Sequence, residues 1–311
     1  MHCLLVYHPR EAETYRRLLE AAGYPGPIRI ARDAREAVEQ IGEADILLAG
    51  RLPDEAWPHA RRLRWIQSMW AGVEQWLRAP LPEGVLLTHM VGPFGPLMAE
   101  YVFAHLLALG QHLETYRRQQ AEARWERHNP EPLRGRTLAV AGLGAIGTEI
   151  ARVGRAFGMR VVGLSRSGKP HPLAEAVYTP DQIEAFCAQA QVLVLVLPHT
   201  PETEGLFGEK ALSALPPGAI LVNVGRGAIL DHDALLRALE SGRVRHAVLD
   251  VFPTEPLPPE SPLWRHPRVT ITPHVAGVSL PEDVVAAFMD NYRRYVAGEP
   301  LVGLVDRQRG Y

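Results

Sequence analysis

Short apolar runs alternate with amphipathic stretches along the first hundred residues. Residues 3–7 (CLLVY) are predicted to form a strand, and residues 11–22 an amphipathic helix that ends at Gly23. Three further apolar runs continue the strands, at residues 28–30, 46–49 and 85–88. Helical segments lie between these runs, so the pattern predicts β-α-β units around a parallel sheet.

The turn-rich segment GPFGP at residues 92–96 precedes the longest helical pattern of the chain, residues 97–120. Apolar residues recur in this pattern at helical spacing, at Val102, Leu106, Leu109 and Leu113. One helix of that length would span about 35 Å, which is enough to cross between two domains. We therefore place a domain boundary here, at residues 98/99.

A second β-α series begins at Thr137. It contains six apolar runs, in the segments LAVAGLGAIG, RVVGLS, AQVLVLVLP, AILVNVG, HAVLDVF and RVTITP. Several of them show no alternation, which is typical of strands buried on both faces. Residues 281–296 then predict one helix that ends at Gly298 and returns to the first domain. The fold class is therefore α/β, with two doubly wound parallel-sheet domains (Rossmann- or flavodoxin-like) and a cleft between them.

A glycine-rich turn lies between the first strand of the second series and its helix, residues 148–157. Its pattern is Gly-x-Gly-x-x-Gly, formed by Gly142, Leu143, Gly144, Ala145, Ile146 and Gly147. The first glycine allows a tight turn, the second lets a pyrophosphate approach the backbone, and the third lets helix pack on strand. The free N–H groups of the helix N-terminus favour an anion. These six residues are predicted to bind a dinucleotide; the alternative is a tight β-α turn without a ligand.

Ser165-Arg166-Ser167 follows the next strand, where an NAD-binding chain would carry Asp or Glu for the adenosine ribose. An arginine between two hydroxyls suits a 2′-phosphate, which an acid would repel. We therefore expect NADP(H) to be the preferred cofactor, with NAD(H) possible. The alternative is a solvated loop with an incidental arginine. His171, in the segment KPHP, is expected to lie in a surface loop.

Three charged residues follow later apolar runs of the second domain: Arg226 in NVGRG, Glu255 in DVFPTEPLP and His274 in PHVAG. Open parallel sheets bind ligands at this edge, outside the carboxyl ends of their strands. One such residue is usually a loop carboxylate, a core histidine or a cap of the sheet edge. An arginine, a glutamate and a histidine at three such positions of one domain indicate a reaction site.

The glycine turn, NVGRG, DVFPTEPLP and PHVAG, in this order, resemble the D-isomer-specific 2-hydroxyacid dehydrogenases. SRS resembles the NADPH-preferring glyoxylate and hydroxypyruvate reductases of that family. The resemblance covers nearly the whole chain. It implies a discontinuous substrate-binding domain, residues 1–98 plus 281–311, and a dinucleotide-binding Rossmann domain, residues 99–280.

The resemblance also implies residue roles. Arg226 would bind the substrate carboxylate and polarise the ketone, His274 would be the general acid or base, and Glu255 would hold His274 and stabilise its charge. Asp250 would face the nicotinamide carboxamide. Further cofactor positions are Leu197, Pro198, Thr203, Val224, Gly225, Arg226, His274, Ala276 and Gly277. The substrate loop would contain Trp70, Ala71, Gly72 and Val73, beside Arg226.

Composition narrows the function further. Lys and Arg number 33 against 35 Asp and Glu, a net charge of −2, and no basic run occurs, so we expect no nucleic-acid partner. No apolar stretch approaches the roughly 20 residues of a membrane span. The two cysteines exclude a disulfide framework. We expect a cytoplasmic protein, with no signal peptide and no metal site.

The sequence therefore predicts an NAD(P)H-dependent reductase of a small 2-oxoacid, such as glyoxylate or hydroxypyruvate, and the resemblance implies a homodimer. Two alternatives stay open. One is a non-catalytic dinucleotide-sensing protein on the same fold, which would have no need for the Glu255 and His274 pair. The other is a dehydrogenase of another small anion, which the pocket near Met69 and Trp70 would distinguish.

Overall fold

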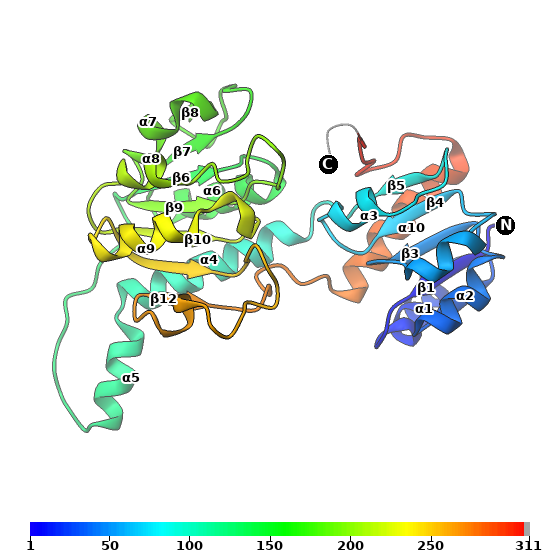
Figure 1. Ribbon diagram of the computed structural model, residues 1–311, viewed down its shortest axis with the longest axis horizontal. Coiled ribbons are helices and arrows are strands. Elements are labelled where there is room, and N and C mark those ends of the chain that lie inside the picture. The colour runs from blue at the N-terminus through cyan, green and yellow to red at the C-terminus, as the bar shows by residue number, and fades with distance from the viewer. Residues whose placement is uncertain (308–311) are drawn as a thin grey trace. The chain divides into compact units, whose positions relative to one another are not determined.

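The computed structural model describes residues 1–307, which form two compact units (Figure 1). Unit 1 contains Met1–Pro93 and the segment from Ser279, and unit 2 is Phe94–Val278. The chain thus passes between the units at 93/94 and 278/279, a few residues before the boundaries expected from the sequence. Residues 308–311 of the expected first domain lie outside the described residues. The roles of the two domains and the cleft between them stay predictions.

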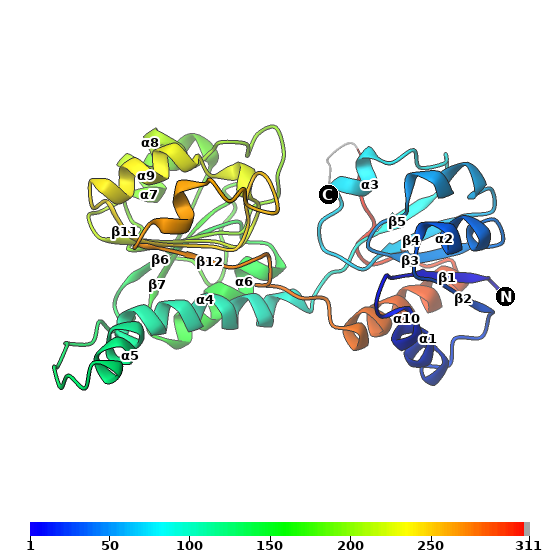
Figure 2. The same ribbon diagram turned by 60° about the horizontal axis from the view of Figure 1, so that its bottom comes forward.

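Unit 1 is a five-stranded parallel sheet in the order β2-β1-β3-β4-β5, with helices on both faces (Figure 2). Its strands are β1 (Leu4–Tyr7), β2 (Ile28–Ala31), β3 (Ile46–Ala49), β4 (Trp65–Ser68) and β5 (Leu86–Thr88). Its helices are α1 (Ala12–Ala21), α2 (Ala34–Ile41), the 3₁₀ helix η1 (Asp54–His59), α3 (Glu74–Arg78) and α10 (Pro281–Ala297). The central strands β1 and β3 are buried on both faces, which explains their unbroken apolar runs.

The C-terminal helix α10 packs beside α1 and belongs to unit 1. Its Phe288 stacks on the indole of Trp65 in β4, with 5.3 Å between the ring centroids. Nearby, the buried Asn291 amide donates to Gln67 Oε1 at 3.0 Å, and Thr88 Oγ1 donates to the same oxygen at 2.8 Å. A buried polar side chain is costly unless it is hydrogen-bonded, so these contacts fix α10 on the sheet.

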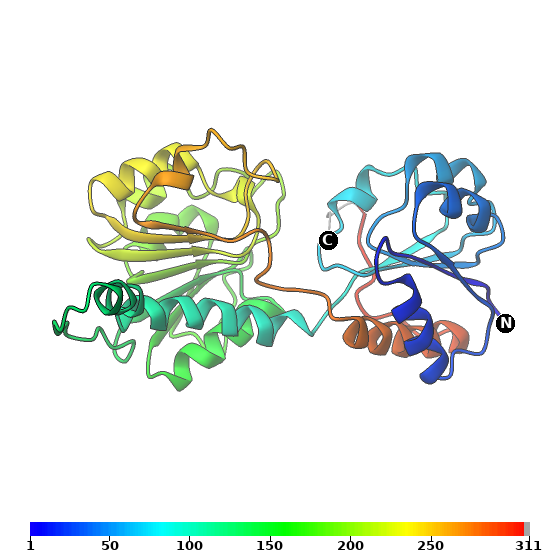
Figure 3. The same cartoon turned by 90° about the horizontal axis from the view of Figure 1, so that it is seen from below.

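Unit 2 is a seven-stranded parallel sheet in the order β12-β11-β10-β9-β6-β7-β8. Its strands are β6 (Thr137–Ala141), β7 (Arg160–Leu164), β8 (Ala176–Tyr178), β9 (Val192–Leu195), β10 (Ala219–Asn223), β11 (Val244–Leu249) and β12 (Val269–Ile271). Its helices are α4 (Phe94–Gly110), α5 (Leu113–Ala121), α6 (Ala145–Ala156), α7 (Ile183–Cys187), α8 (Glu209–Ser213) and α9 (His232–Glu240), with 3₁₀ helices η2 (Pro180–Gln182), η3 (Gly227–Ile229) and η4 (Pro262–Arg265). Helices α4 and α6 cover one face, and α8 and α9 lie on the other (Figure 3).

The single helix predicted over residues 97–120 is wrong, because the structure has two helices there. Helix α4 ends at Gly110, and His112 adopts a left-handed backbone conformation with φ of 54°. At Gly110 the returning chain comes so close that an added Cβ would lie 2.7 Å from Glu131 O, and Glu131 donates its N–H to Gly110 O. Leu113 is therefore exposed, although its spacing continues the buried face of Val102 and Leu106.

The sequence pattern does not predict two of the short strands, β4 and β8. Strand β4 has the sequence WIQS, whose last two residues are polar yet fully buried. Strand β8 is a half-buried edge strand of three residues. Neither carries the apolar run that indicates a buried strand, so periodicity alone does not find them.

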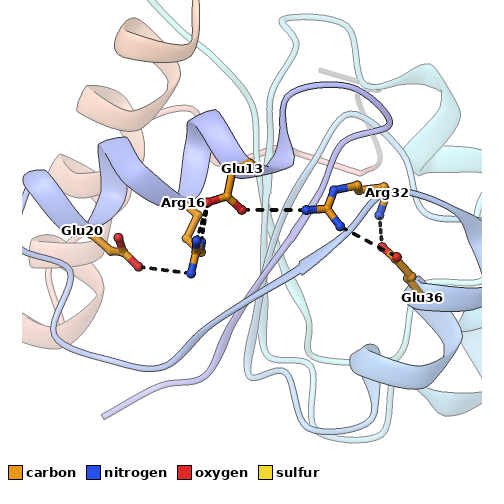
Figure 4. A network of polar contacts seen from close by, with 5 residues as sticks. All are labelled: Glu13, Arg16, Glu20, Arg32 and Glu36. Atoms are coloured by element: carbon orange, nitrogen blue, oxygen red, sulfur yellow. Dashed lines mark hydrogen bonds and ion pairs between the residues drawn. The ribbon is translucent and has the colours of Figure 1, made fainter.

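Exposed charges connect the surface helices of unit 1 (Figure 4). Glu13 on α1 pairs with Arg16 and with Arg32, and Arg32 also pairs with Glu36 on α2. Such solvent-exposed pairs are weak because water and salt screen their charges, so they add little to the packing of the sheet. Among the described helices, none has both the length and the apolar character needed to cross a membrane.

Candidate active site

The carboxyl ends of the unit 2 strands form one edge, where the predicted cofactor and catalytic residues lie. Strand β6 lies between β7 and β9. From β6 the chain continues to β7 and β8 on one side of the sheet, and it then crosses to β9 on the other side of β6. This reversal is the position at which open α/β sheets bind ligands. The glycine turn follows β6, and the segments with Arg226, Glu255 and His274 follow β10, β11 and β12. These loops therefore share an edge.

The glycine turn needs its glycines for different physical reasons. Gly142 has φ of 104°, a conformation that L side chains rarely adopt, and its N–H donates to Leu164 O at 2.9 Å. A Cβ on Gly147 would lie 1.8 Å from Gly142 O, so only glycine permits this close packing of helix on strand. Gly144 differs, because a Cβ there would meet no protein atom within 4 Å. The space beside Gly144 is open.

The N-terminus of α6 fits a pyrophosphate. No side chain caps this helix of 12 residues. Within the described residues, the N–H groups of Ala145, Ile146 and Gly147 donate no hydrogen bond. Uncapped N–H groups and the helix dipole favour an anion, and the open space at Gly144 lets the anion approach the backbone. These residues can therefore hold the phosphates of a dinucleotide.

The segment after β9 lies against the glycine turn and the loop after β10. A Cβ on Gly142 would lie 3.3 Å from Leu197 Cδ2, and one on Gly225 would lie 2.8 Å from Leu197 O. The Thr203 hydroxyl instead donates to Pro198 O at 2.7 Å and accepts from the N–H of Thr200 at 2.8 Å. Thr203 thus shapes its own turn, while Leu197 lies between two predicted cofactor segments.

Ser165, Arg166 and Ser167 lie in the loop after β7. The Ser165 N–H donates to Tyr178 O in β8 at 2.9 Å, and Arg166 is exposed. Hydrogen bonds from Thr200 and from its own backbone hold the pKa of Glu202 low, and the charge of Arg166 adds to this effect. The charge of Arg166, in the loop after β7, therefore acts on Glu202, in the segment after β9.

His274 and Glu255 form a direct pair. His274 Nδ1 lies 2.8 Å from Glu255 Oε2, and Glu255 Oε1 accepts the N–H of Phe252 at 2.9 Å. Because an ionised carboxylate only accepts, the ring proton is on Nδ1. Nε2 has no hydrogen-bond partner within the described residues, and the ring is about half exposed, at 49%. A protonated ring can give a proton to a ligand from Nε2 and remain paired with Glu255.

Asp250 holds the backbone around His274. Its carbonyl accepts the N–H of His274, and its carboxylate accepts the N–H groups of Val275 and Ala276, each at 2.9 Å. Thr272 Oγ1 donates to the same carboxylate. Asp250 is 1% exposed, so this charge depends on those donors. His274 itself has φ of 56°, a conformation uncommon outside glycine.

A second support reaches the same loop from helix α4. Tyr101 Oη lies 2.6 Å from Thr272 Oγ1. Since the Thr272 proton goes to Asp250, Tyr101 is the donor. Burial raises the pKa of Tyr101 to about 12, which keeps the hydroxyl protonated. A Cβ on Gly277 would lie 3.0 Å from Met98 Cγ, so α4 also packs closely on this loop. Neither Tyr101 nor Thr272 belongs to a motif that marks it in the sequence, although Thr272 stands two residues before His274.

Arg226 lies in the neighbouring loop, which Asn223 shapes. The fully buried Asn223 accepts the N–H of Gly225 and donates to Arg226 O, both at 3.1 Å. The Arg226 guanidinium donates to Gly225 O at 2.8 Å. A Cβ on Gly227 would lie 1.9 Å from the Phe252 carbonyl carbon, so the loops after β10 and β11 touch. The structure thus joins the segments of Arg226 and Glu255 through their backbones.

The predicted substrate loop lies in unit 1, after β4. The N–H groups of Ala71, Gly72 and Val73 donate no hydrogen bond within the part of the chain that the structure describes. His89 Nδ1 lies 3.0 Å from Ala71 O, and burial lowers the pKa of His89. Met69 is buried, whereas Trp70 is 45% exposed and rests on Gly50. Three successive N–H groups are therefore available to an anion.

Other catalytic chemistry finds little support among the described residues. They contain no group of three or more His, Cys, Asp or Glu side chains that could hold a metal ion. Burial raises the pKa of the Cys187 thiol to about 12, so this cysteine is no nucleophile at neutral pH.

The family model described as D-isomer specific 2-hydroxyacid dehydrogenase, NAD binding domain, matches residues 103–276, more than half of the chain. The chain belongs to this family. Its members are NAD(P)-dependent oxidoreductases, and the enzyme class predicted from the sequence is thereby confirmed.

Individual relatives agree with this assignment. Over 275 residues, the chain is 36% identical to glyoxylate/hydroxypyruvate reductase A of Serratia proteamaculans, covering 86% of this chain and 88% of the relative. A family member from Aeromonas salmonicida has a crystal structure with a TM-score of 0.92 and 43% identity, covering 99% of this chain and 100% of that one. The NADPH-dependent glyoxylate/hydroxypyruvate reductase of Sinorhizobium meliloti, in complex with NADP and sulfate, gives a TM-score of 0.89 and 28% identity, covering both chains fully.

Two glycine variants separate the packing of the glycine turn from its ligand. We expect Gly147→Ala to lower Tm by several degrees, because overpacking of this kind costs about 1–3 kcal/mol. We expect Gly144→Ala to leave Tm unchanged, since φ is −75° and the space is open, but to weaken NADP⁺ binding roughly tenfold or more. Thermal unfolding and isothermal titration calorimetry measure both effects. Equal destabilisation of the two variants, or unchanged affinity in Gly144→Ala, would contradict this assignment.

Proposed function

We propose that the chain reduces a small 2-oxoacid, such as glyoxylate or hydroxypyruvate, to the D-2-hydroxyacid with NADPH. The observation that carries this proposal is the His274–Glu255 pair, whose ring presents Nε2 at the sheet edge that also holds the glycine turn. A dinucleotide sensor has no need for such an acid pair. The reductases of Serratia proteamaculans and Sinorhizobium meliloti support the choice of substrate class.

In the proposed mechanism, NADPH supplies the hydride when it is bound. The Arg226 guanidinium binds the substrate carboxylate and draws electron density from the ketone. His274 donates its Nε2 proton to the carbonyl oxygen as the carbon is reduced, and Glu255 stabilises the imidazolium form before the transfer. In the opposite direction, neutral His274 takes the proton from the hydroxyl. Proton transfer of this kind contributes typically 10²–10⁴-fold to the rate.

We assign the anionic groups of the ligands to donors of the chain. The first turn of α6 would hold the cofactor pyrophosphate, with Gly144 allowing the approach. Arg166, between Ser165 and Ser167, would pair with a 2′-phosphate, which selects NADP(H) over NAD(H). The N–H groups of Ala71, Gly72 and Val73 would support the substrate carboxylate.

We infer that the chain forms a homodimer. Helix α5 and the segment after it expose large apolar side chains: Leu113 at 56%, Tyr116 at 37% and Trp125 at 98%. Exposed large apolar side chains are typical of a protein interface, and a second copy of the chain would cover them. Light scattering after size exclusion should give the mass of two chains, and Leu113→Glu should shift it toward one. A monomeric wild type would contradict the inference.

His274 and Glu255 can be tested by substitution. We expect His274→Ala to lower kcat by about 100-fold or more, because no other group would deliver the proton. Glu255→Gln should lower kcat less, since the amide can still accept from the ring but carries no charge to stabilise the imidazolium form. Both variants should retain their Kd for NADP⁺. A His274→Ala variant that turns over at nearly the wild-type rate would remove the acid–base role.

Cofactor choice is tested by following nicotinamide absorbance with glyoxylate or hydroxypyruvate, using NADPH and NADH side by side. We expect faster turnover with NADPH, and we expect Arg166→Ala to reduce the NADPH/NADH ratio of kcat/KM by roughly tenfold or more, as charged hydrogen bonds are worth about 1.5–3 kcal/mol. Arg35→Ala, at an exposed arginine of unit 1, is the matched control. An unchanged ratio in Arg166→Ala would refute the 2′-phosphate assignment.

A further inference from the structure

His171 joins the loop after β7 to helix α6. Its Nε2 lies 3.2 Å from Thr148 Oγ1, and Thr148 Oγ1 donates to Leu143 O in the glycine turn at 3.4 Å. On its other side, His171 Nδ1 accepts the N–H of Leu173 at 3.3 Å. His171 thus lies in a loop, as expected from the sequence, but its ring is half-buried and hydrogen-bonded at both nitrogens.

The hydrogen bonds agree on one direction. Since Leu173 N–H donates to Nδ1, the neutral ring carries its proton on Nε2. Nε2–H then donates to Thr148 Oγ1, and the Thr148 proton goes on to Leu143 O. The His171 ring and the Thr148 hydroxyl each donate once and accept once, so these three hydrogen bonds are mutually compatible. This series of hydrogen bonds ends at Leu143, a residue of the glycine turn.

The backbone of the loop supports the same arrangement. Pro170 and Pro172 flank His171; Pro172 restricts the backbone of His171, and Pro170 that of Lys169, to extended conformations. Gly168 has φ of 61°, and a Cβ on it would lie 2.8 Å from Thr179 Cγ2. The loop thus starts at Ser165, which is bonded to β8, turns at Gly168, and is tied to α6 by His171. Ser165, Arg166 and Ser167 lie between the two attachments.

The side chain of Leu143 links the same parts by packing. A Cβ on Gly163 in β7 would lie 2.2 Å from Leu143 Cδ1, so Leu143 covers the end of that strand just before Ser165. The glycine turn, the start of α6 and the loop after β7 are therefore connected by direct contacts. The His171–Thr148 contact is one of the contacts that fix the loop relative to the glycine turn.

We propose that His171 and Thr148 are specificity-determining positioning residues, which hold the Ser165–Ser167 turn where it recognises the 2′-phosphate of NADP(H). This inference rests on the proposed preference for NADP(H). Neither side chain needs to touch the cofactor. Their contact reduces the number of positions open to Arg166 before binding, so less conformational entropy is lost when the 2′-phosphate is bound.

Binding measured without turnover tests this role. We expect His171→Ala and Thr148→Val each to raise the Kd of NADP⁺ about 3- to 10-fold, the effect of one hydrogen bond, and to leave the Kd of NAD⁺ within about twofold. The double variant should be less impaired than the product of the two single effects, because both remove one contact. Thr148→Ser and His171→Gln retain a hydroxyl and an amide donor, and should restore much of the affinity. Isothermal titration calorimetry gives all of these values.

His59→Ala, at an exposed histidine of unit 1, is the matched control and should bind both cofactors like the wild type. Equal loss of NADP⁺ and NAD⁺ affinity in His171→Ala would overturn the inference, as it would show a general structural role. Unchanged affinity for both would overturn it too. If His171→Ala folds poorly, Thr148→Val decides by the same criterion.

The 2′-phosphate assignment of Arg166 and the positioning role of His171 and Thr148 are contradicted by different results. If Arg166→Ala weakens NADP⁺ binding selectively and the His171 and Thr148 variants do not, only the positioning role is lost. If Arg166→Ala leaves the ratio of the two Kd values unchanged, the 2′-phosphate assignment itself is wrong, and the positioning role falls with it.

Discussion

The carboxylate of Asp250 is buried, and the edge of unit 2 that holds the proposed catalytic residues depends on the hydrogen bonds that this carboxylate accepts. Thr272, Val275 and Ala276 supply hydrogen bonds to its carboxylate, and its carbonyl holds the N–H of His274. A buried carboxylate without donors would cost several kcal/mol, so the loop must keep the backbone that presents these donors. That backbone includes the left-handed conformation of His274, which brings the ring to Glu255. The position of the proposed acid is thus set by an interaction in which its side chain takes no part.

The parallel sheet of unit 2 brings segments that are distant in the sequence to one edge. Because all strands of unit 2 are parallel, each β-α connection at one edge adds a loop there. Glycines let these loops approach: Gly225 accommodates Leu197, and Gly227 accommodates the backbone of Phe252. A methyl group at either position would separate the neighbouring loops. The loops at this edge are therefore held together largely by backbone packing, and the polar side chains add their hydrogen bonds to it.

Much of this arrangement is predictable from the sequence. Buried strands have unbroken apolar runs, and the two parallel-sheet α/β units and the family follow from those runs and from the motifs they precede. Short elements with polar residues escape the same reasoning: β4 ends in Gln67 and Ser68, whose burial depends on partners far along the chain such as Asn291. The break after Gly110 also depends on a distant segment, because Glu131 approaches there. Tyr101 and His171 gain their importance from contacts across 171 and 23 residues of sequence, which no local pattern contains. The roles proposed for Arg226, Glu255 and His274 rest on the motifs and on the geometry together.

The return of helix α10 to unit 1 has a consequence for how the chain folds as it is synthesised. The sheet of unit 1 is made before unit 2, yet Trp65 and Gln67 receive their partners Phe288 and Asn291 only after all of unit 2 has been made. Unit 2 is contiguous, so it completes its core while unit 1 still lacks a covering helix. Domains fold as units in the order in which they emerge from the ribosome, and here that order is reversed by the topology. Helix α10, which completes unit 1, is made after the whole of unit 2.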